Sequence, residues 1–168
     1  MEFRLAEAFE LEEIKAMFSD LVMVMKQNGV DIWDEVYPVE FFKDDIAARR
    51  LYILKDSAGI ACAFVLCGHN QGEDEVDWDD PGAKALYIDR LGVAPERSRQ
   101  GIGGLALEKA KEEAAAQGCV YLRLFVVDIN EPAIRLYEKS GFKRADGIYQ
   151  EIIDQDLTLN EYGYEIKI

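Results

Sequence analysis

The chain has little cysteine, which forms disulfides and binds metals, and little histidine, which also binds metals. Its 168 residues include three cysteines and one histidine, His69. Cys62, Cys67 and Cys119 have no metal-ligand spacing, and their odd number argues against a disulfide framework. We therefore expect no metal, a reducing cytoplasmic location, cysteines that pack in the core and a histidine at the surface.

Long apolar runs and basic residues are also scarce. No segment reaches the roughly 18 apolar residues of a membrane span, and the first residues lack the pattern of a signal peptide. Nineteen Lys and Arg residues stand against 33 Asp and Glu residues, which gives a net charge of −14. A charge of this sign repels nucleic acid and anionic membranes. We therefore expect a soluble protein that binds neither.

The chain has no linker, internal repeat or low-complexity tract. Its length is enough for one domain with a hydrophobic core, because a chain of this size buries roughly 70% of its unfolded surface. The sequence therefore predicts a single domain over residues 1–168.

Hydrophobic periodicity predicts a short strand from Phe3, an amphipathic helix over 10–27 that ends at Gly29, and a shorter helix over 41–49. Two β-forming runs, 51–54 and 60–67, predict a hairpin because a glycine-containing turn separates them. Trp33 and Tyr37 lie between the helices. We expect these aromatics either to pack in the core or to line a substrate pocket.

The middle of the chain reads as a strand over 85–93, a helix from 102 closed by Gly118, and a strand over 119–127. Such a succession predicts a right-handed βαβ unit with two parallel strands. Asn130 is expected to cap the next helix, which ends at Gly141. Two further strands are expected over 142–149 and 162–168.

Six acidic residues lie within the segment 68–81, which joins the hairpin to the third strand. They are Glu73, Asp74, Glu75, Asp77, Asp79 and Asp80. The segment is expected to be a solvated loop, with a rim that attracts cations as the alternative.

A glycine-rich turn follows the strand over 85–93 and opens the next helix. Gly101, Gly103 and Gly104 carry no side chain that would hold a ligand away from the backbone. The amides of such a turn and the positive end of the helix dipole converge on an anion, and Arg97 and Arg99 add local positive charge. The turn therefore predicts a seat for a pyrophosphate.

Two blocks of the sequence resemble the GNAT superfamily of N-acetyltransferases. The block Arg99-Gln-Gly-Ile-Gly-Gly is similar to the family's acetyl-CoA pyrophosphate motif, and Asn130-Glu-Pro-Ala-Ile-Arg-Leu-Tyr-Glu-Lys-Ser-Gly-Phe to its second cofactor motif. Their separation by about 30 residues, across a helix and a strand, makes chance agreement improbable. One departure is Ser98, where the family prefers Gln or Arg; we expect Arg97 or Arg99 to compensate.

The resemblance covers nearly the whole chain and implies a fold of mixed α/β type. In this fold a mostly antiparallel twisted sheet holds a central parallel strand pair and is flanked by helices. The resemblance also implies that acetyl-CoA is the co-substrate, with no metal. The residues that it places beside the cofactor are Leu91, Gly92, Val93, Arg97, Ser98, Arg99, Gln100, Gly101, Ile102, Gly103, Gly104, Asn130, Ala133 and Tyr137.

Acetyl transfer from a thioester to an amine needs an acid for the leaving thiolate, a donor to the oxyanion and an acceptor for the amine proton. By resemblance, Tyr137 is the acid and the Val93 amide the oxyanion donor. A tyrosine with a reference pKa near 10 is protonated at pH 7 and can donate to a thiolate.

The base is expected to be Asp89. Strand alternation places Asp89 on a face with apolar neighbours, where burial would raise the pKa of its carboxyl group toward a useful value. The resemblance supports it, because the same strand often carries a catalytic carboxylate in the family. The alternative is that Asp89 is a charge partner of Arg90 or another arginine.

The sequence leaves two alternatives to acetyl transfer to consider. Gly101 to Ala106 also fits a dinucleotide fingerprint, but seven residues separate Val93 from Gly101, whereas that fingerprint follows its strand directly. The second alternative is a non-catalytic acyl-CoA-binding or sensor module on the same fold. The acceptor is expected to be an amine of a small molecule or peptide, with Trp33 and Tyr37 in contact with it, and the acidic charge of the chain favours a cationic amine. The protein is expected to be a monomer or a homodimer.

Overall fold

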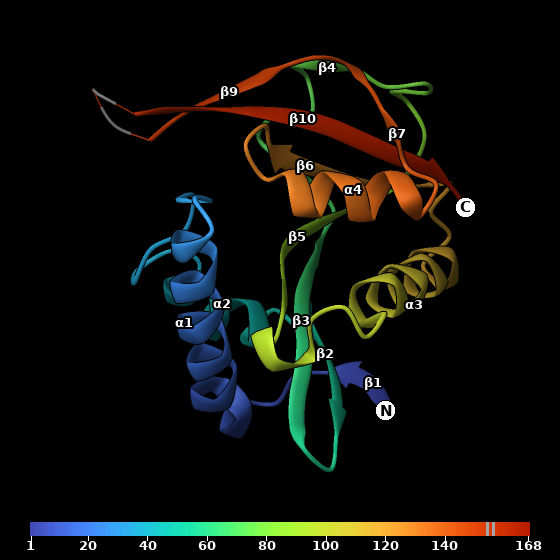
Figure 1. Cartoon of the computed structure of the whole chain (residues 1–168). Helices are drawn as coiled ribbons and strands as arrows, with labels where there is room; N and C mark the ends of the chain where they lie inside the picture. Colours follow the sequence, from blue (N-terminus) through green and yellow to red (C-terminus); the bar gives the residue numbers. More distant parts are fainter. Residues whose placement is uncertain (154, 156) are drawn as a thin grey trace. The chain divides into compact units, whose positions relative to one another are not determined.

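Helices and strands follow the mixed α/β order that the sequence predicts (Figure 1). The structure is a computed structural model and describes residues 1–153, 155 and 157–168. These residues form two units: residues 1–66 and 90–109 belong to the first, and residues 67–89 and 110–168 to the second. The chain passes between the units within strand β3, strand β5 and helix α3. The single domain stays a prediction.

The first unit holds an antiparallel sheet. Strand β1 (Glu2–Leu5) pairs with β2 (Leu51–Asp56), and β2 pairs with β3 (Gly59–Cys67), which confirms the expected hairpin. The helical segments with residues in this unit are η1 (Ala8–Glu10), α1 (Leu11–Gln27), η2 (Val39–Phe41), α2 (Phe42–Ala47), η3 (Pro95–Arg97) and α3 (Ile102–Ala116).

Helix α1 has the predicted length because its apolar residues recur on one face. Ile14, Met17 and Phe18 are buried, and Gly29 ends the helix with a φ of +79°, where the chain needs the left-handed conformation. Helix α2 is shorter than expected and ends at Ala47.

A buried carboxylate ties the start of α1 to the sheet. Glu10 has a side chain that is 0% exposed, and it accepts hydrogen bonds from Arg4 at 2.8 and 2.9 Å and from Lys55 at 3.0 Å. The hydrogen bond from Arg4 lowers the pKa of Glu10 to about 2. The carboxylate is therefore charged at neutral pH, and its burial is compensated by two cations.

The second unit contains the predicted parallel strand pair. Strand β5 (Ala85–Val93) runs parallel to β6 (Tyr121–Val127), with Ala85 opposite Tyr121 and Ile88 opposite Leu124. Strand β10 (Thr158–Lys167) pairs antiparallel with β6, and β7 (Lys143–Arg144) and β9 (Tyr149–Ile152) pair antiparallel with β10. The expected mixture of mostly antiparallel pairing with one parallel pair is confirmed.

The prediction of a single strand over 142–149 is wrong. The chain forms three short strands there: β7, β8 (Asp146–Gly147) and β9. Strand β8 leaves β10 and pairs with β4 (Val76–Asp77), while Gly147 adopts a φ of +100°. A Cβ at Gly147 would lie 2.9 Å from the Glu75 carbonyl oxygen, so the close approach of β4 requires glycine.

The acidic segment before β5 is more ordered than a solvated loop. Most of its acidic side chains are exposed, but Val76 and Trp78 are buried in a cluster with Tyr87 and Ala145. The Trp78 ring also meets the Phe125 ring edge-on at 5.6 Å. This apolar anchoring holds the segment against β5 and β6.

Helix α4 (Glu131–Lys139) packs beside β10 in the second unit, as Figure 1 shows. The Tyr164 hydroxyl on β10 donates to Glu138 of α4 at 3.0 Å, and the Tyr137 and Tyr164 rings lie 6.4 Å apart. Gly141 ends the helix with a φ of +89°, as predicted.

Cys62, Cys119 and His69 lie where the sequence predicts, whereas Cys67 is less buried than expected. Cys62 and Cys119 are buried, Cys67 is partly buried, and burial raises the pKa of the Cys62 thiol. His69 is exposed and contacts Glu73 at 2.7 Å.

Candidate functional site

The glycine-rich turn of the first unit forms an exposed entry to helix α3. Arg99 and Gly101 both adopt left-handed backbone conformations, with φ values of +61° and +80°. The carbonyl of Gly101 accepts the Leu105 amide at 3.0 Å, so the amides of Ile102, Gly103 and Gly104 belong to the first turn of the helix. Amides in a first turn have no partner within the helix and can bind an anion.

Space is left beside this turn. A Cβ built on Gly101 or on Gly104 would meet no atom within 4 Å, so protein packing does not require glycine at Gly104. A ligand that approaches the backbone would give that requirement. The expectation that the glycines give access to a phosphate stays a prediction.

The two arginines of the turn differ in their partners. Arg97 donates two hydrogen bonds to Asp56, at 3.2 and 2.7 Å, and this pair lowers the pKa of Asp56 to about 2. Arg99 is exposed and has no ion-pair partner in the part of the chain that the structure describes. Arg99 is therefore the free cation of the turn, beside an exposed Ser98.

The end of strand β5 is tightly packed in the first unit. Gly92 is buried, and a Cβ there would lie 2.6 Å from the Phe18 ring of α1. Leu91 and Val93 flank Gly92 and are partly buried. The backbone that the family resemblance assigns to the cofactor arm is thus held against α1.

Trp33 and Tyr37 are each partly buried and contact other aromatic rings. Trp33 lies 5.7 Å from Phe18, and Tyr37 meets Phe41 edge-on at 5.7 Å. Asp34 accepts the amides of Val36 and Tyr37 at 2.7 Å, which shapes the loop and lowers the pKa of Asp34. Packing and substrate contact both remain compatible with these positions.

In the second unit, the family's second motif lies on α4. The Asn130 side chain accepts the Ala133 amide at 3.4 Å, which confirms the predicted helix cap. Tyr137 is 7% exposed, with the Phe142 ring 6.0 Å away. Its role as an acid stays a prediction.

Three carboxylates from three strands interact in the second unit. Asp89 on β5 is partly buried, as expected, while Glu151 is on β9 and Glu161 on β10. Burial raises the pKa of Glu161 to about 8, and a hydrogen bond and charge repulsion from Glu151, with the charge of Asp89, contribute.

Sequence reasoning missed Glu151 and Glu161. The alternation of β10 could have indicated Glu161, because Glu161, Gly163 and Glu165 share one face and the last two are buried. The neighbouring Arg90, offered as an alternative partner of Asp89, binds the buried Asp45 of the first unit.

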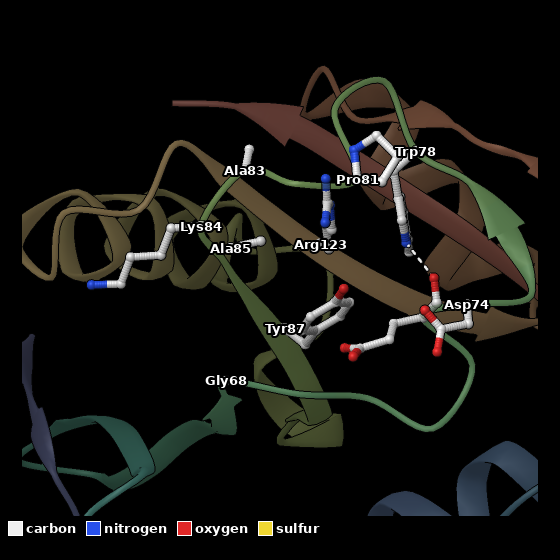
Figure 2. Close-up of a pocket in the computed structure, with 10 residues that line it drawn as sticks. Gly68, Asp74, Trp78, Pro81, Ala83, Lys84, Ala85, Tyr87 and Arg123 are labelled. Carbon is white, nitrogen blue, oxygen red and sulfur yellow. Dashed lines mark hydrogen bonds between the residues drawn. The ribbon is translucent and has the colours of Figure 1, made fainter.

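A pocket of about 280 Å³ lies beside β5 and β6 in the second unit (Figure 2). Figure 2 shows Trp78, Arg123 and Tyr87 around the same space, while the Lys84 side chain points away from it. The buried Arg123 donates to Glu165 at 3.1 Å and to the Asp80 carbonyl at 2.7 Å. Arg123 is thus held by groups outside the pocket lining, while the Trp78 indole donates to the Glu73 carbonyl within it at 2.8 Å.

The residues that the structure describes exclude 154 and 156. They contain no group of three or more His, Cys, Asp or Glu side chains that could hold a metal ion. No helix among them is long and apolar enough to cross a membrane.

Comparison with known proteins identifies the class. The family model "Acetyltransferase (GNAT) family" matches residues 16–142, and the chain belongs to this family. Acetylation that depends on acetyl-CoA is the general activity of the family.

Among curated relatives, YwnH of Bacillus subtilis is 27% identical over 160 residues, which cover 93% of this chain and 91% of YwnH. The name of YwnH provisionally assigns it phosphinothricin acetyltransferase activity. N-alpha-acetyltransferase 60 of Xenopus tropicalis is 26% identical over 141 residues, which cover 77% of this chain and 58% of that protein.

Solved structures share the fold. A GNAT acetyltransferase from Streptococcus agalactiae has a TM-score of 0.83 at 17% identity, over 99% of this chain and 95% of that one. The yncA protein of Salmonella typhimurium, provisionally named an acetyltransferase and solved with acetyl-CoA, has a TM-score of 0.71 at 14% identity, over 99% and 93% of the chains.

Proposed function

We propose that the protein transfers the acetyl group of acetyl-CoA to a primary amine of a small molecule or peptide, by direct attack in a ternary complex. The turn that opens α3 is the observation that supports this most directly. Its glycines leave space beside unpaired helix amides, and Arg99 adds a free cation. In this proposal the turn binds the pyrophosphate of acetyl-CoA, and Asn130 and Ala133 lie along the cofactor.

The proposed reaction breaks one bond for each that it forms. The amine nitrogen forms a C–N bond with the thioester carbonyl carbon, and the Val93 amide donates to the resulting oxyanion. The intermediate collapses with cleavage of the C–S bond. The departing thiolate takes the proton of the Tyr137 hydroxyl, which is restored from solvent.

Before attack, the ammonium group gives one proton to Asp89, directly or through a water, because only the neutral amine has a lone pair. The second proton that the nitrogen loses as the amide forms passes to solvent, which restores the proton that Tyr137 gave to the thiolate. The neighbouring Glu161 supports this assignment, because burial and the charges of Glu151 and Asp89 raise its pKa to about 8, where a carboxyl group can take up a proton near neutral pH. The cluster supplies the acceptor that amine attack requires.

The acceptor is proposed to be a cation before it reacts, with Trp33 and Tyr37 in contact with it. The overall charge of −14 favours the approach of a positively charged amine. The names of relatives include a phosphinothricin acetyltransferase, provisionally assigned, and an N-alpha-acetyltransferase, so small molecules and peptides both belong in the test.

The first experiment measures thiol release from acetyl-CoA with a panel of amines: polyamines, amino acids and peptides. Gly104→Val should raise the KM for acetyl-CoA by about 10-fold, because the added side chain enters the space that we assign to phosphate. Ala115→Val, an exposed position later in α3, is the matched control and should leave this KM unchanged. An unchanged KM in Gly104→Val would remove the turn from the site.

The second experiment tests the acid. Tyr137→Phe should lower kcat by about 10²-fold and leave acetyl-CoA affinity nearly unchanged, as expected for a lost proton donor. If the wild type binds acetyl-CoA but releases no thiol with any amine, the proposed acetyltransferase activity is contradicted. It would favour an acyl-CoA-binding module instead.

A further inference from the structure

Arg90 has an unusual backbone conformation in the last part of strand β5. Its φ is +50°, which is uncommon for a residue with a side chain and rare within a strand. Leu91, Gly92 and Val93 follow it directly, and they are the residues whose backbone we assign to the acetyl donor. Such conformations persist where surrounding contacts hold them, and they concentrate at functional sites.

The contact that holds Arg90 comes from helix α2. The Asp45 carboxylate is 0% exposed, and the Arg90 guanidinium, 8% exposed, donates its Nε to one carboxylate oxygen at 3.2 Å. The Nη2 atom of Arg90 lies 3.1 Å from Oδ1 and 3.0 Å from Oδ2 of Asp45. The same guanidinium lies 5.3 Å from the centre of the Phe41 ring. A buried pair with this many contacts fixes the side chain and with it the backbone of Arg90.

Two further contacts leave the strand end little freedom in the first unit. Phe18 closes on Gly92, as described above, and the Ala94 amide donates to the Ala61 carbonyl at 2.9 Å. The segment 91–93 is thus held after Arg90 by packing and a hydrogen bond. The direction in which the segment 91–93 leaves residue 90 depends on the backbone conformation of Arg90.

We propose that Asp45 and Arg90 are positioning residues for acetyl transfer, whose ion pair maintains the left-handed conformation of Arg90 and so aims the peptide groups of Leu91 and Val93. This role rests on the proposed function, because it assumes that those peptide groups contact the acetyl donor. Neither side chain touches the reacting atoms in this proposal. A displacement of peptide groups by about 1 Å can lower turnover by as much as 10²-fold.

Arg50 provides a matched control. Its Nε donates to the same Asp45 carboxylate at 2.7 Å, but its side chain is 42% exposed and it lies outside strand β5. Asp45→Asn should lower kcat/KM for acetyl-CoA by about 10-fold or more and leave the KM for the amine unchanged. Arg50→Ala should keep the wild-type value.

Glycine at position 90 separates a backbone role from a merely structural one. Glycine adopts a φ of +50° at little cost, whereas alanine does not. We expect Arg90→Ala to lose about as much activity as Asp45→Asn, and Arg90→Gly to recover most of it. In the Arg90→Gly background, Asp45→Asn should cause no further loss, because no guanidinium remains to be held.

Hydrogen exchange gives a readout that does not depend on activity. Exchange of the amides over 90–94 should increase in Asp45→Asn and stay at the wild-type rate in Arg50→Ala, with both variants measured below their melting temperatures. If the wild type is active and both Asp45→Asn and Arg90→Ala keep the wild-type kcat/KM, the positioning role alone is overturned. Equal losses in Arg90→Gly and Arg90→Ala would also overturn it. A wild type with no thiol release for any amine would instead overturn the proposed function.

Discussion

Glu161→Gln should make the protein more stable at alkaline pH and leave its stability at acidic pH nearly unchanged. The pKa of Glu161 lies near 8 in the folded chain, against an ordinary value of 4.5. Between these values the folded chain holds a proton that the unfolded chain releases. Stability that is present below pH 4.5 is therefore lost as the pH rises through 8. Glutamine cannot ionise, so the variant avoids this loss.

The size of the effect follows from the two pKa values. One pKa unit corresponds to about 1.4 kcal/mol, so the whole difference is at most about 5 kcal/mol. Glu161 shares its proton with Glu151, and the cluster can rearrange when it charges. We therefore expect a measured gain of about 2 kcal/mol at pH 8.5 and less than about 0.5 kcal/mol at pH 5.

The assay is the free energy of unfolding in urea, measured from pH 5 to pH 9 for the wild type and the variant. Glu75→Gln is the matched control, because Glu75 is an exposed glutamate of the same unit, and its effect should not grow with pH. Parallel pH curves for the wild type and Glu161→Gln would refute the reasoning, because the raised pKa would then contribute nothing to stability.

Three further predictions concern other groups. Asp89→Asn should lower kcat by about 10²-fold, because it removes the proposed proton acceptor, and it should lower the pKa of Glu161, which the charge of Asp89 helps to raise; a pH profile of thiol release by the variant checks both. Glu10→Gln should cost about 2 kcal/mol in urea unfolding, because Arg4 loses a buried charged partner. Gly92→Ala should cost about 1–3 kcal/mol or displace Phe18, since the added methyl would lie 2.6 Å from that ring; urea unfolding and a crystal structure check this.

The parts of the fold that the sequence predicted well have local signals. Strand β5 and the caps of α1 and α4 were predictable because β-forming alternation, Gly29 and Asn130 each act within a few residues. The pairing of β4 with β8 was not predictable. It joins segments 70 residues apart and depends on a close contact at Gly147 that only the folded chain creates.

The charged residues of the candidate site also combine features with a local sequence signal and contacts between distant segments. Motif spacing located the turn and α4, but it did not distinguish Arg97 from Arg99 as the source of positive charge at the turn. Asp56, 41 residues away, engages Arg97 and leaves Arg99 free, and the sequence contains no sign of this pairing.

Asp89 and Arg90 are neighbours in the sequence, yet their backbone conformations and their contacts differ. A periodicity of two places consecutive strand residues on opposite faces, and this regular geometry underlies the expectation for Asp89. The left-handed backbone of Arg90 breaks that geometry at the next residue, where Asp45 holds the guanidinium. A strand without this interruption would carry Asp89 in the same place and would aim the Leu91 and Val93 peptide groups differently. The position of the proposed base therefore follows from local alternation, whereas the proposed aim of the Leu91 and Val93 peptide groups rests on a contact from α2.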